Sequence, residues 1–143
     1  MTTAAGTLCA SALSLLMLGC SDGSLEPSSP LPPEFDLEAL YGRWAWVSTC
    51  CGFGGGPSDT PASTGSTGLL VFEPTGALRS YRNDSLVVTT TFAVRIENQQ
   101  GRDVVLLSRG DRSFSEELRL RADTLELVPP CFDCATSRFE RAP

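Results

Sequence analysis

The sequence predicts an all-β domain, a small eight-stranded antiparallel up-and-down barrel with a short N-terminal plug helix. Two observations carry this prediction. Trp44 and Trp46 share a parity within a strand-like run, so a pleated strand points both rings to one face. Short segments of alternating apolar and polar residues then recur along the chain, and turn residues close each of them. The chain of 143 residues accommodates one such domain.

The first element, residues 1–19, has the composition of an export signal. From Leu8 to Leu18 almost every residue is apolar or small, and Gly19 stands directly before Cys20. This resembles the lipobox of bacterial lipoproteins, which implies cleavage after Gly19 and lipidation of Cys20. A plain secretory signal or a membrane helix is the alternative, although the apolar run is short for a bilayer span.

Residues 20–33 form the second element, which consists of Cys20, the expected lipidation site, and a tether rich in proline and serine. The barrel domain occupies residues 34–143. It opens with Glu34 to Leu40, where apolar side chains at helical spacing directly after prolines predict the plug helix. Leu40 to Cys51 is the first strand, and its two indoles are expected to nucleate the core.

Residues 52–66 are predicted to be a long irregular loop that is either a functional lid or simply mobile. The remaining strands are expected at Thr67–Glu73, Ala77–Arg82, Leu86–Ile96, Val104–Ser108, Leu118–Arg121, Thr124–Val128 and Ala135–Arg141. Hairpin connections between consecutive strands let the last strand pair with the first, and this closure removes both exposed edges.

Several short motifs resemble a small bacterial lipocalin-like lipoprotein domain. They are Gly42-Arg43-Trp44 after a short helix, Phe72 with Gly76, Asp123-Thr124-Leu125, and Phe139-Glu140-Arg141. The resemblance implies a closed barrel end formed by Gly42 and Trp44, with Trp44 packed under an arginine near the C-terminus. That arginine is Arg141 or, failing it, Arg138.

Two interpretations of the barrel interior stay open. A short eight-stranded barrel can be filled by side chains alone, and the aromatic residues supply enough bulk to do so. The same residues could instead line a lumen that binds a ligand at the end bearing the long loop. The residues expected to fill the interior are Trp44, Trp46, Phe72, Tyr81 and Phe92. The candidate lumen residues are Trp46, Phe53, Phe72, Tyr81 and Phe92.

Four cysteines of the barrel domain form a Cys-Cys pair, Cys50 and Cys51, and a Cys-x-x-Cys pair, Cys131 and Cys134. In an up-and-down barrel the end of the first strand lies beside the start of the last. We therefore favour disulfides that join the two pairs across this seam in an oxidising compartment. A local bridge between Cys131 and Cys134, a zinc site and a redox pair are the alternatives.

Composition argues against several classes of function. The chain has no histidine, the usual general base and metal ligand, and its eleven basic residues against seventeen acids argue against nucleic acid. Glu116 and Glu117 are expected to be solvated and, as strand neighbours, to point to opposite faces. We therefore expect no catalytic residue, cofactor or metal.

The expected function is non-catalytic binding of a small apolar ligand by a monomeric lipoprotein of the bacterial cell envelope, anchored at the outer membrane by its lipid. The alternative is a barrel that binds or inhibits another envelope protein through its loops.

Overall fold

The computed structural model describes residues 35–50, 57–131 and 133–143. These residues belong to one compact unit, which runs from Pro32 to Pro143. The expected lipidation site Cys20, the vicinal cysteine Cys51 and the loop residue Phe53 lie outside the described residues.

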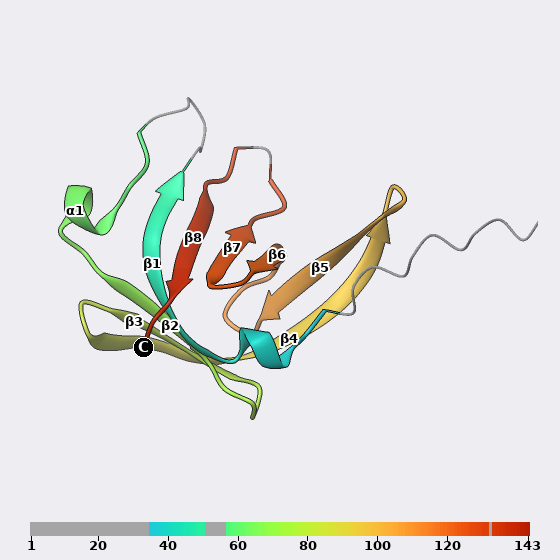
Figure 1. The fold of residues 1–143 in the computed structure, drawn as a ribbon, viewed down its shortest axis with the longest axis horizontal. Coiled ribbons are helices and arrows are strands. Elements are labelled where there is room, and N and C mark those ends of the chain that lie inside the picture. The colour runs from blue at the N-terminus through green and yellow to red at the C-terminus, as the bar shows by residue number, and fades with distance from the viewer. Residues whose placement is uncertain (1–34, 51–56, 132) are drawn as a thin grey trace, which may run out of the picture. The chain divides into compact units, whose positions relative to one another are not determined.

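The unit is a closed antiparallel barrel of eight strands, as predicted (Figure 1). Every strand pairs with its neighbour in the chain, and β1 pairs with β8 to close the ring. The strands are β1 (Gly42–Cys50), β2 (Gly68–Phe72), β3 (Ala77–Arg82), β4 (Ser85–Gln99), β5 (Arg102–Arg109), β6 (Ser115–Arg121), β7 (Thr124–Val128) and β8 (Thr136–Arg141).

Tight turns between the strands follow the residue preferences of hairpins. Asn83 and Asp84 join β3 to β4 with φ values of 50° and 61°, and Gln100 and Gly101 join β4 to β5 at 54° and 80°. Two successive positive φ values match the right-handed twist of the flanking strands, and asparagine, aspartate and glycine adopt them at least cost. The local sequence therefore specifies these hairpins.

The closed end of the barrel, where β1 begins, is covered by a 3₁₀ helix at Glu38–Leu40. This is the predicted plug helix, and it is shorter than the expected segment. Leu40 and Trp44 are fully buried, and the Trp44 indole Nε1 donates a hydrogen bond of 2.8 Å to the Leu40 carbonyl. The Trp44 side chain therefore holds the plug helix against the first strand.

Arg141, at the end of β8, lies over the ring of Trp44 at 4.3 Å from its centroid. Its guanidinium donates hydrogen bonds to the carbonyls of Ala39 and Tyr41 at 2.6 and 3.2 Å. Gly42 permits this approach, because its φ is 123° and a Cβ there would lie 3.1 Å from Arg141 Nη1. Arg141, rather than Arg138, thus takes the position expected at the closed end.

Inward-facing residues from all parts of the barrel fill its closed half. Phe72 is buried and meets the partly buried Phe92 edge to face at 5.0 Å between ring centroids. The buried cluster comprises Leu40, Trp44, Leu70, Phe72, Leu78, Leu107, Leu118, Leu125, Leu127 and Phe139. This packed half is the core of the barrel, and its members Leu70, Leu127 and Phe139 also border the space at the opposite, open end.

The segment between β1 and β2 is more ordered than the sequence predicted. Asp59 pairs with Thr49 through two backbone hydrogen bonds of 2.9 Å, so the returning chain is fixed to β1. A one-turn helix, α1 (Pro61–Thr64), follows and is capped by Thr60 and Ser63. The prediction of an irregular loop was wrong for residues 59–64, because it missed this capping signal.

Candidate functional site

The open end of the barrel, where β1 ends and β8 begins, holds a pocket of about 310 Å³. Trp46 and Phe139 supply aromatic surface, and Arg109, Arg112 and Glu116 supply charge. The other lining residues are Gly68, Leu69, Leu70, Ser80, Tyr81, Leu127, Pro129, Ala135 and Ser137. Its volume is at the lower end of the range for small-molecule sites, and its lining combines apolar surface with a few convergent polar groups.

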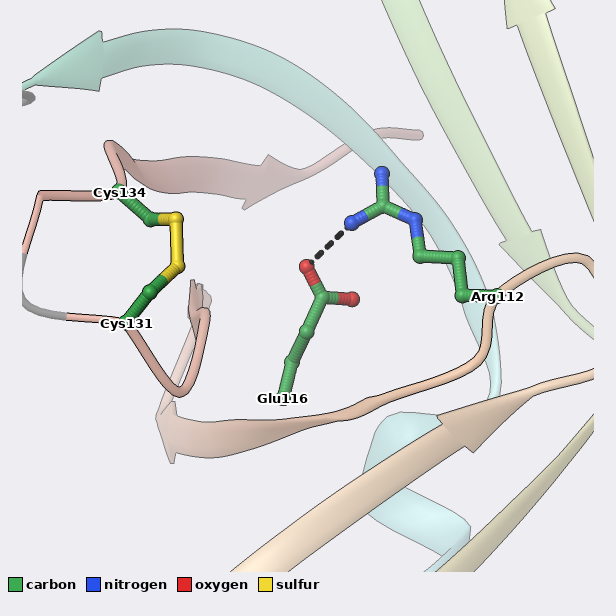
Figure 2. Close-up of a disulfide and its surroundings, with 4 residues drawn as sticks. All are labelled: Arg112, Glu116, Cys131 and Cys134. Carbon is green, nitrogen blue, oxygen red and sulfur yellow. Dashed lines mark hydrogen bonds and ion pairs between the residues drawn. A yellow bond between two sulfur atoms is a disulfide. The ribbon is translucent and has the colours of Figure 1, made fainter.

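Glu116 is the centre of the charged wall of this pocket. Its side chain is 5% exposed, and Oε1 accepts a hydrogen bond from Arg112 Nη1 at 2.7 Å (Figure 2). Its other oxygen, Oε2, lies 3.4 Å from Arg109 Nε. One buried carboxylate therefore faces two guanidinium groups, and the three side chains together carry one net positive charge.

Arg109 is as deeply buried as Glu116, with 8% of its side chain exposed. Among the residues that the structure describes, three buried atoms have no hydrogen-bond partner: Arg109 Nε, Arg109 Nη2 and Glu116 Oε2. The 3.4 Å contact between Nε and Oε2 is an ion pair without the geometry of a hydrogen bond. Buried polar groups are rarely left in this condition, so the cluster is a candidate for recognition of a ligand.

The surroundings of Arg109 also act on its protonation equilibrium. Burial lowers the pKa of the Arg109 guanidinium, since desolvation disfavours its charged form, and the nearby Glu116 carboxylate opposes this effect. Arg112 adds a repulsion, and Asp111, whose carboxylate is 4.0 Å from Arg109 Nε, adds a weaker attraction. The guanidinium stays charged at neutral pH and needs a counter-charge.

Strand alternation explains how these side chains reach the interior. On β5, Arg109 follows the buried Leu107 by two residues, and on β6, Glu116 precedes the buried Leu118 by two. The expectation that Glu116 is solvated was therefore wrong. Its neighbour Glu117 does point to the opposite, outer face, where hydrogen bonds from Arg119 lower the pKa of its carboxyl group.

The sequence did not identify Arg109, Arg112 or Glu116 as site residues. For Arg109 and Glu116 the signal was present, because an alternating strand places the residue two positions from an inward leucine on the same face. Arg112 lies in the connection between β5 and β6, where alternation gives no signal. The general preference of charged residues for solvent outweighed that signal.

The aromatic residues expected in the lumen divide between the two halves of the barrel. Trp46 lines the pocket, and Phe72 and Phe92 belong to the packed half. Tyr81 borders the pocket but also lines an outer groove with Arg43, Leu69 and Val71. It pairs with Leu69, on the side opposite to the buried Leu70, and so stands at the edge of the site.

Cys131 and Cys134 form a disulfide with each other, at a Cα separation of 5.3 Å (Figure 2). The favoured prediction of bridges from this pair across the β1–β8 seam was therefore wrong. The topological premise was correct, because Cys50 pairs with Thr136 at the start of β8. A Cys-x-x-Cys turn already brings its own sulfurs within bonding distance, and this local bridge forms instead. Cys50 is also disulfide-bonded, to neither of these two cysteines.

The local bridge closes the connection between β7 and β8, which contributes Pro129 and Ala135 to the pocket. It therefore fixes one wall of the site. In the described parts of the chain, no group of three or more histidine, cysteine or acidic residues could hold a metal ion. No helix in these parts has the length and apolar character to cross a membrane.

The sequence matches no protein-family model, and comparisons with curated proteins and with solved structures give no match either.

Proposed function

We propose that this protein is a lipid-anchored component of the bacterial cell envelope, at the outer membrane, whose barrel binds a small apolar ligand without transforming it. The observation that supports binding is the open-end pocket, bounded by Trp46 and Phe139 and wide enough for a small molecule. The packed half forms the floor of the pocket through Leu70, Leu127 and Phe139, which belong to both. The leader ending in Gly19-Cys20 supports the anchor.

Filling the pocket should abolish ligand binding. We expect Ala135→Trp to weaken the binding of Nile red, a neutral apolar dye, by at least tenfold, because Ala135 lies in the pocket wall. The matched control is Ala93→Trp, which adds the same side chain to an exposed position on β4. Fluorescence titration of the purified full chain measures both. Equal affinities of the two variants would show that the dye binds elsewhere and would contradict the pocket assignment.

Lipidation is tested by Cys20→Ser. We expect this variant to leave the membrane fraction and to retain its leader. In the processing of bacterial lipoproteins, whose lipobox this motif resembles, acylation of the cysteine thiol precedes cleavage, here after Gly19. Cys9→Ser, within the leader, is the control and should be processed and anchored normally. Fractionation with mass spectrometry of the N-terminus reads out both results. Unchanged membrane partition of Cys20→Ser would refute the anchor.

One observation favours the alternative of a protein-binding barrel. Leu86 and Val87, next to the β3–β4 turn, are 54% and 61% exposed, and exposed apolar surface that is contiguous is a feature of protein contacts. This alternative predicts that Ala135→Trp leaves all binding functions intact, whereas Val87→Asp removes the interaction with a partner protein.

A further inference from the structure

The polar wall of the pocket indicates the kind of head group that its ligand carries. We propose that Arg109 binds the carboxylate of an amphipathic ligand whose apolar chain lies against Trp46 and Phe139. This inference rests on the proposed binding function and specifies its ligand class.

The two unpartnered nitrogens of Arg109, Nε and Nη2, lie on the same edge of the planar guanidinium. This edge presents two nearly parallel N–H groups, the fork that matches the two oxygens of a carboxylate. Nε has an ionic neighbour in Glu116 Oε2 at 3.4 Å, whereas no ion pair within the described residues involves Nη2. A carboxylate placed at this edge would satisfy both donors.

The charges of the site are balanced, so recognition of an anion depends on Arg109 itself. Arg109 and Glu116 form a buried pair, and Arg112 and Asp111, which are 38% and 32% exposed, add one charge of each sign beside it. Solvent screens these two exposed groups more than the buried pair. A bound carboxylate is therefore favoured by direct charge-assisted hydrogen bonds from Arg109 rather than by a net charge of the cluster.

Glu116 fixes the position of this edge. Its Oε1 is held by Arg112 at 2.7 Å, which leaves Oε2 to orient Arg109 without occupying both of its nitrogens. The remaining acceptor, Glu116 Oε2, can bind a hydroxyl or a water molecule beside the carboxylate. Apolar surface for the chain of the ligand is available in the same pocket, because Trp46 and Phe139 line it together with Arg109.

Three probes with the same apolar chain separate the head group from the tail: octanoate, octan-1-ol and octylammonium. In calorimetric titrations of the full chain at neutral pH, octanoate should bind about tenfold to a hundredfold more tightly than octanol, the range of a charge-assisted hydrogen bond. Octylammonium should bind most weakly. Equal binding of octanoate and octanol would overturn the carboxylate proposal and leave the apolar pocket standing. Failure of all three to bind would overturn both proposals.

Arg109→Met removes the fork while keeping an apolar side chain of comparable length. It should abolish the preference for octanoate over octanol without weakening octanol binding. Arg95→Met is the matched control, because the side chain of Arg95 is 51% exposed on the outer face. If the single variant unfolds, the double variant Arg109→Met, Glu116→Gln removes the opposing charge as well and serves the same test. Retention of the octanoate preference in the folded variant would contradict the role of Arg109.

Discussion

Replacing Trp44 by alanine is expected to lower the free energy of unfolding by about 3 to 5 kcal/mol. The indole is fully buried at the closed end, donates a hydrogen bond to the Leu40 carbonyl and lies under the guanidinium of Arg141. Its removal leaves a cavity and also frees the plug helix and the end of β8.

The matched comparison is Ile96→Ala on β4, a truncation of a large apolar side chain that is 51% exposed. We expect it to lower the free energy of unfolding by less than about 1 kcal/mol, because a half-exposed side chain buries little apolar surface on folding. Urea titrations that follow circular dichroism measure both variants without relying on tryptophan fluorescence. Similar losses at the two positions would mean that the core is assigned to the wrong half of the barrel.

The second large effect is expected for Glu116→Ala, at about 3 to 5 kcal/mol of lost stability. The substitution leaves Arg109 buried with no close counter-charge except the more distant Asp111. Glu117→Ala, on the outer face of the same strand, should cost about 1 kcal/mol or less, because the ion pairs of Glu117 involve more exposed arginines.

The double variant Arg109→Met, Glu116→Leu distinguishes a stranded charge from a lost contact. If the penalty of Glu116→Ala comes from the unpaired guanidinium, replacing both partners by apolar side chains should restore most of the stability. Thermal and urea unfolding of the single and double variants measure this recovery. A double variant as unstable as Glu116→Ala would show that Glu116 stabilises the barrel by another route.

Much of the fold could be predicted from the sequence because its local signals agree with one another. Three local signals each specify an element without reference to distant residues. They are the alternation of apolar residues in β4, the turn residues Asn83 and Asp84, and the shared parity of Trp44 and Trp46. Hairpin connections between all consecutive strands then allow the last strand to pair with the first. The packing of Arg141 on Trp44 came from resemblance to other proteins rather than from the pattern alone.

The site was harder to predict because its charged side chains are stabilised by ion pairs that strand alternation does not reveal. Alternation from Leu118 indicates that Glu116 points inward, but only its partners, Arg109 at the end of β5 and Arg112 in the β5–β6 connection, explain why a carboxylate is stable there. The cysteine pairing failed for a related reason. Proximity across the seam was correctly inferred, yet sequence does not rank two geometrically feasible bridges.

The order in which the strands pair around the ring has a consequence for how the chain folds. Seven of its pairings join consecutive strands, whereas the β1–β8 seam brings together residues as distant in the chain as Trp44 and Arg141. Long loops are entropically slow to close, so we expect the hairpins to form early and the seam to form last. Since the Cys131–Cys134 bridge lies within one connection and does not cross the seam, that last step does not depend on its oxidation. The chain can thus complete its ring while these two thiols are still reduced, and oxidation then secures a pocket wall that is already in place.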